Sequence, residues 1–70
     1  MNNNLILDGK HRTNIQIGNK VAIVLKHYQR TGLLTNGLVK RFLTKSSYHP
    51  HGIKVQLYSG EIGRVKHVLD

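Results

Sequence analysis

The chain has 70 residues, enough for one domain, and no cysteine, which excludes disulfides and thiolate metal sites. Because so short a chain buries only about 60% of the surface that it exposes when unfolded, a large enclosed active-site cavity is not expected. Eleven Lys and Arg residues against three acids give a formal charge of +8, which favours polyanionic partners and above all nucleic acid.

Residues 1–16 carry many polar and charged residues and have little periodicity, and they predict a flexible basic N-terminal arm that precedes a folded domain over residues 17–70. The apolar run at residues 5–7 could pair at a sheet edge. It is too short for a signal-peptide core of about 7–15 residues or a membrane span of about 20. We therefore expect a cytoplasmic protein that does not bind membranes, since no segment has the broad apolar face of an interfacial helix.

Residues 20–27 predict the first strand of the domain. Val21, Ile23 and Leu25 fall on one face, and the residues between them fall on the other. This period of two is typical of a half-buried strand. Residues 28–33, which include Gly32, predict a connecting loop.

Residues 34–44 predict a second extended stretch, in which the adjacent Lys40 and Arg41 break the alternation. A bulge or a strong twist near Gly37 would accommodate them. A helix over residues 38–44 is the competing prediction, but a run of about seven residues between Gly and Ser-Ser is short for a helix.

Residues 45–52 predict a loop, because they contain the only proline of the chain. Residues 53–58 then alternate cleanly between apolar and polar side chains. A turn at Ser59-Gly60 leads to a last strand over residues 61–69, with Ile62, Val65 and Val68 as its apolar residues.

Four or five short antiparallel strands without a helical stripe predict an all-β fold. An open sheet of this size could not cover both of its faces, whereas closure into a barrel removes exposed edges and gives one core. We therefore predict a small Src-homology-3-like barrel. An oligonucleotide-binding-type barrel is the alternative, although it usually needs a longer chain and often a helix.

Two strings carry a family resemblance, QRTG at residues 29–32 and HPHGIKVQL at residues 49–57, together with Gly60-x-x-Gly63-Arg64-Val65. With these motifs the chain resembles the YwbE family of small bacterial proteins, a domain of unknown function, over residues 14–69. The resemblance implies that these residues form one unit. The Gly37-x-Val39 pattern is more loosely similar to KOW-type barrels of ribosomal and transcription-elongation proteins.

Catalytic and metal chemistry find little support in the residue types. His49 and His51 flank Pro50 and could join other histidines around a metal, but a zinc site needs three or four protein ligands. Ser46 and Ser47 have no nearby acid that could orient a histidine for nucleophilic attack. Paired carboxylates and a phosphate-cradling loop are also missing. We predict no enzyme activity, no metal and no cofactor.

Basic residues at outward strand positions and in loops can neutralise phosphates without disturbing the core, and the interleaved tyrosines can stack on unpaired bases. The QRTG and HPHG loops would add a polar patch at one end of the barrel. The predicted nucleic-acid-binding residues are Lys26, Tyr28, Arg30, Lys40, Arg41, Lys45, Tyr48, His49, His51, Lys54, Arg64 and Lys66.

These features predict a binding module for structured or single-stranded RNA, favoured over DNA, with a ribosome-associated or RNA-processing role. The alternative is a protein-interaction module that takes a peptide or protein partner through a sheet edge or a groove. A third alternative is a metal-dependent enzyme that uses His49 and His51. The simplest explanation of the high charge is solubility alone.

Overall fold

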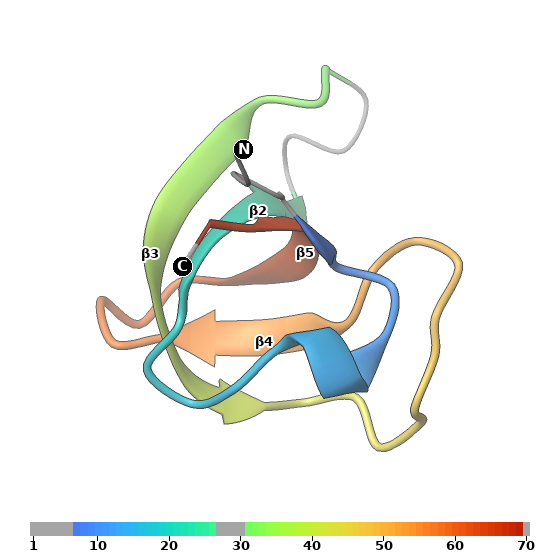
Figure 1. Cartoon of the computed structure of the whole chain (residues 1–70). Helices are drawn as coiled ribbons and strands as arrows, with labels where there is room; N and C mark the ends of the chain where they lie inside the picture. Colours follow the sequence, from blue (N-terminus) through green and yellow to red (C-terminus); the bar gives the residue numbers. More distant parts are fainter. Residues whose placement is uncertain (1–6, 27–30, 70) are drawn as a thin grey trace, which may run out of the picture.

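A computed structural model shows a closed antiparallel barrel with one short extra strand (Figure 1). The structure describes residues 7–26 and 31–69. In chain order the elements are β1 (Leu7–Asp8), the 3-10 turn η1 (Arg12–Asn14), β2 (Lys20–Leu25), β3 (Leu34–Phe42), β4 (Lys54–Leu57) and β5 (Ile62–Val68). The predicted all-β barrel is confirmed, and strand β3 occupies most of the segment for which a helix was the competing prediction.

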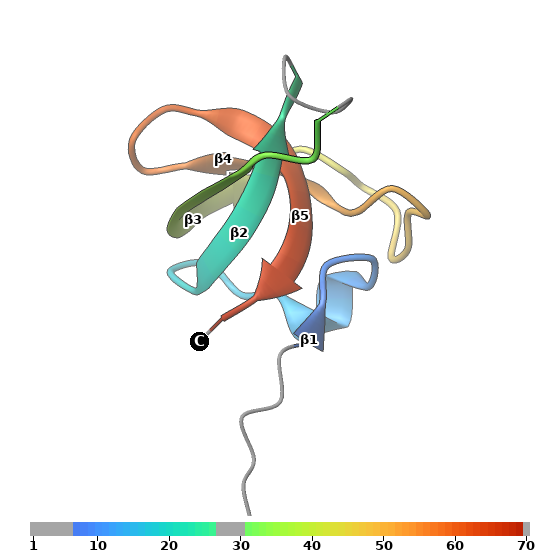
Figure 2. The same ribbon diagram turned by 90° about the horizontal axis from the view of Figure 1, so that it is seen from above.

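Closure of the barrel comes from β4, which pairs with both β3 and β5. Because β2 also pairs with β3 and β5, the four longer strands form a ring. Strand β1 lies beside the end of β5, with Leu7 opposite Val68 and Asp8 opposite His67 (Figure 2). The ring gives this short chain a single core. No helix in the two described ranges is long and apolar enough to cross a membrane.

The core is built from the inward residues of the ring. In the β4 segment Ile53, Val55 and Leu57 are fully buried, as the alternation predicted. Strand β2 differs from its prediction as a half-buried strand, because Ala22 and Val24 on its second face are also buried. Residues of β5 and of the turn at residues 31–33 border the hollows above Val24 and so help to cover that face.

Two register shifts explain sequence patterns that simple alternation does not. In the β3–β4 pair the register shifts between Val39 and Arg41, so that Lys40 has no Cα partner. The bulge therefore lies at Lys40, three residues after Gly37, whereas the prediction was a bulge or a strong twist near Gly37. Gly37 has another role, because an added Cβ would lie 2.6 Å from Cδ1 of Leu57. Its missing side chain thus leaves room for the core.

The second shift lies in the β2–β5 pair, where Ala22 is opposite His67 and Ile23 is opposite Val65. Lys66 is the residue left without a partner in this register. The extra residue allows Val65 and Val68, which are three positions apart, both to be buried.

The described part of the predicted arm, residues 7–16, is packed against the barrel. Ile15 is 3% exposed and belongs to the core. The backbone N–H of Ile53 donates to the carbonyl oxygen of Gly9 at 2.7 Å, and that of Arg12 donates to Ser47 at 2.8 Å. The folded unit in the structure therefore includes residues 7–16 and differs from the domain start predicted at residue 17. Residues 1–6 lie outside the described residues.

Candidate nucleic-acid interface

Three adjoining hollows follow the outer side of β5. The first is lined by Lys26, Lys54, Ile62, Gly63 and Arg64. The second is lined by Val24, Gly32, His51, Arg64 and Lys66. The third is lined by Asp8, Lys10, Val24, Gly32, Leu34, Lys66 and His67. Since Arg64 borders the first two and Lys66 the last two, the hollows adjoin one another along β5, and we refer to them together as the β5 groove.

Arg64 and Lys66 form the centre of this groove. Nη1 of Arg64 donates to the carbonyl oxygen of Gly52 at 3.1 Å, and Nζ of Lys66 donates to the carbonyl oxygen of His51 at 3.4 Å. Two consecutive carbonyl groups of one loop thus hold two cationic side chains next to each other.

The close approach of this loop to β5 depends on Gly52. Its φ is +102°, and an added Cβ would overlap the carbonyl oxygen of Val65. Only glycine combines this left-handed backbone with the lack of a side chain. The HPHG string therefore has a structural reason to end in glycine. Because Gly52 allows the close approach, the carbonyl oxygens of Gly52 and His51 lie next to Arg64 and Lys66.

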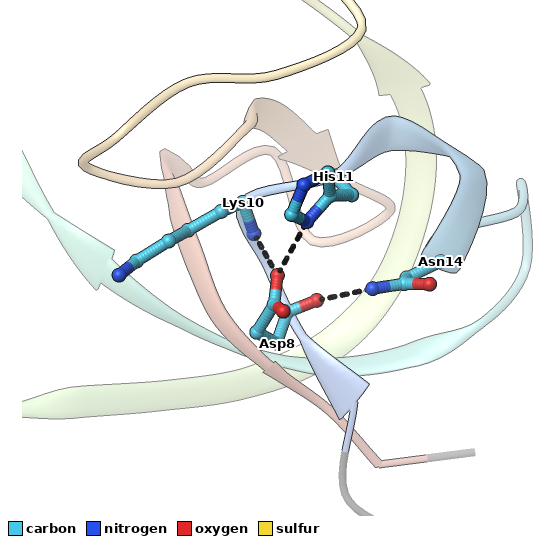
Figure 3. Close-up of polar contacts among 4 residues, drawn as sticks. All are labelled: Asp8, Lys10, His11 and Asn14. Atoms are coloured by element: carbon cyan, nitrogen blue, oxygen red, sulfur yellow. Dashed lines mark hydrogen bonds and ion pairs between the residues drawn. The ribbon is translucent and has the colours of Figure 1, made fainter.

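Asp8 is the single carboxylate among the described residues that line the groove, and it lies at one end. Its Oδ1 accepts from the backbone N–H of Lys10 at 2.8 Å and lies 3.3 Å from Nδ1 of His11 (Figure 3). Asn14 donates to its main-chain oxygen at 3.2 Å. The hydrogen bond from Lys10 is the main cause that lowers the pKa of Asp8. The carboxylate of Asp8 is thus bonded to residues of its own N-terminal segment.

The loop at residues 45–52, the histidine loop, carries His49 and His51 beside the groove. The backbone N–H of His51 donates to Nδ1 of His49 at 3.1 Å, so a neutral His49 carries its proton on Nε2. Burial, followed by the nearby charges of Arg64 and His51, lowers the pKa of His49. Within residues 7–26 and 31–69, no three His, Asp or Glu side chains gather closely enough to hold a metal ion.

The structure brings together five of the predicted site residues along the groove: Lys26, His51, Lys54, Arg64 and Lys66. His49 lies in the adjoining loop. Tyr28 and Arg30 lie outside the described residues, so the predicted patch of two loops is described only on its histidine side.

The other four predicted residues do not line the groove. Arg41 on β3 donates from Nε to Oε1 of Gln56 at 2.7 Å. The ring of Tyr48 is tilted against that of His11, with centroids 4.9 Å apart. Lys40 and Lys45 are exposed, Lys40 on β3 and Lys45 in the following loop.

Two basic residues that sequence reasoning did not assign to the site, Lys10 and His67, also line the groove. Lys10 was assigned to the predicted arm. The backbone N–H of His49 donates to the carbonyl oxygen of Lys10 at 2.9 Å, which fixes the N-terminal segment beside the histidine loop. The sequence signal for this placement was Gly9, directly before Lys10, because a glycine can mark a close approach of the backbone to another segment.

Comparison with known proteins places the chain in a family. Residues 8–68 match the family described as an uncharacterized conserved protein, DUF2196. The chain belongs to this family. The uncharacterized protein YwbE of Bacillus subtilis (strain 168) is 52% identical over 63 residues, which span 90% of this chain and 97% of the relative. The predicted family resemblance is confirmed, and no solved structure matches the chain. The DUF2196 match begins at Asp8 and so includes the packed N-terminal segment.

Proposed function

We propose that this DUF2196 protein is a non-enzymatic RNA-binding module that holds the phosphates of the RNA in the β5 groove. The observation that carries the proposal is the placement of Arg64 and Lys66 on adjacent carbonyls of one loop. The hollow that they share has no carboxylate among its described lining residues. Like charges held together without an anion repel each other, and a bound phosphate would remove this repulsion.

The arrangement of the other cations favours a linear polyanion over a single anion. Lys26 and Lys54 border one end of the groove, and Lys10 borders the other. A row of cations can contact successive phosphates of one strand, and shallow basic surfaces on small barrels suit single-stranded RNA. A cytoplasmic location and a ribosome-associated or RNA-processing role belong to this proposal.

The salt dependence of RNA binding tests the proposal. Fluorescence anisotropy of a labelled mixed-sequence RNA and a matched DNA duplex would be titrated with the protein between about 50 and 200 mM salt. If the five Lys and Arg residues of the groove each contact one phosphate, the log–log slope for a single strand is about −3.5.

Single variants then place the contacts. Lys66→Ala should weaken RNA binding and make the slope less steep by about 0.7, because one phosphate contact is lost. Lys40→Ala removes the same charge from an exposed position on β3 outside the groove, and we expect little change. The absence of RNA binding at the lowest salt, or equal losses in both variants, would overturn the proposal. The interaction module for a protein partner would then be the better explanation.

A further inference from the structure

The third hollow of the groove has an apolar part. Beyond Lys66 it encloses about 600 Å³, and Val24, Gly32 and Leu34 line it together with Lys10 and His67. Leu34 is 44% exposed although it belongs to a strand, whereas Val24 beneath the hollow is 2% exposed. The hollow therefore offers an accessible apolar side chain between cationic groups.

The turn beside Leu34 leaves this hollow open. Gly32 has a φ of +73°, and nothing lies within 4 Å of the position that its Cβ would take. Gly32 therefore adds no side chain to the hollow that it lines.

We propose that this hollow, the Leu34 subsite, takes one unpaired base of the bound strand, so that the protein selects single-stranded RNA over duplex. This inference rests on the proposed function. A nucleotide has an apolar base face next to an anionic phosphate, and the subsite matches it with Leu34 next to Lys66 and Lys10. In a duplex the base faces are stacked, and reaching Leu34 would require extrusion of a base.

The charges around the subsite favour a nucleotide over an uncharged apolar ligand. Lys10 and Lys66 border the hollow, against Asp8 as the one described acid. The carboxylate of Asp8 already accepts the backbone N–H of Lys10. An apolar peptide would cover Leu34 but would leave the cations beside it without a partner.

Three probes of equal length separate base contacts from phosphate contacts. They are a mixed-sequence single-stranded RNA, a strand with the same backbone and no bases, and a fully paired RNA duplex, all measured by anisotropy with the wild-type protein. We expect the single strand to bind about tenfold more tightly than the abasic strand, because one base would cover the exposed part of Leu34. The duplex should also bind more weakly than the single strand.

Leu34→Ala locates the contact. It should weaken binding of the single-stranded RNA about five- to tenfold and leave the abasic strand unchanged, because three partly exposed side-chain carbon atoms that the base would cover are lost. Leu38→Ala is the matched control, since Leu38 is 48% exposed on the same strand and lines none of the three hollows. Thermal unfolding of both variants verifies that they fold.

The possible failures are distinguishable. If all three probes bind equally and Leu34→Ala has no effect, the Leu34 subsite is refuted and phosphate binding by the groove stands. If no nucleic acid binds at low salt but an acidic peptide does, both this inference and the proposed function fail. The probe comparison uses the wild-type protein, so it decides the matter even if Leu34→Ala does not fold.

Discussion

Replacement of Gly9 with alanine tests whether the N-terminal segment is part of the folded unit. A Cβ on Gly9 would overlap the carbonyl oxygen of Val65 and lie 2.5 Å from Cγ1 of the same residue. Neither the β5 backbone nor a fully buried valine can move away at low cost. The segment itself must therefore shift away from β5.

The size of the effect follows from the contacts that such a shift would break. Gly9 donates its N–H to the carbonyl oxygen of Lys66 at 3.2 Å and accepts from the N–H of Ile53 at 2.7 Å. Each bond contributes about 1 kcal/mol net, and overpacking typically costs a further 1–3 kcal/mol or so. We expect the free energy of unfolding to fall by about 3–5 kcal/mol, which lowers the Tm by roughly 12–40 °C in a domain of this size.

Urea and thermal unfolding followed by far-UV circular dichroism measure the change. Gly60→Ala is the control, because its φ of +97° adds left-handed strain of about 1–2 kcal/mol, while no atom lies within 4 Å of the new Cβ. Gly9 does not have a positive φ. If the segment were only loosely docked, Gly9→Ala would be neutral or would stabilise the fold by about 0.4–1 kcal/mol. That result would refute the reasoning.

Two further predictions concern the core and the histidine loop. Leu57→Ala removes a fully buried side chain and should lower the free energy of unfolding by about 2–5 kcal/mol in urea titrations; a smaller loss would mean that the core is poorly packed. Because burial and the charges of Arg64 and His51 lower the pKa of His49, its contribution to stability is present above its ordinary value of 6.5 and is lost as the pH falls below it. The free energy of unfolding, measured at pH 7.5 and pH 5.5, should therefore depend less on pH in His49→Gln than in the wild type. His67→Gln is the control. An equal pH dependence of the two variants would contradict this cause.

Much of the barrel could be predicted from local sequence patterns. The alternation over residues 53–58 identifies the buried face of β4, because successive side chains of a strand point to opposite faces. The turn at Gly60 follows from a residue that takes a positive φ without steric strain. The QRTG and HPHGIKVQL strings identified the family.

Local patterns could not place the bulges or the N-terminal segment. Lys40 and Lys66 are skipped in their ladders because the strands must curve to close the ring, and closure depends on all four strands together. Residues 7–16 lack periodicity and so were predicted as an arm. Their order comes from backbone hydrogen bonds to β5 and the histidine loop, which a pattern of side chains does not reveal.

The sequence by itself determined the fold class, the family and the excess of positive charge, because these depend on composition, on the period of two and on short strings. Only the tertiary structure decided which basic residues lie close together. Lys10, His51 and Lys66 are far apart in the chain, and the barrel brings them to one groove by pairing and packing distant segments. The same closure leaves Lys40 and Arg41 outside the groove, although their charges are indistinguishable in the sequence from those of Arg64 and Lys66.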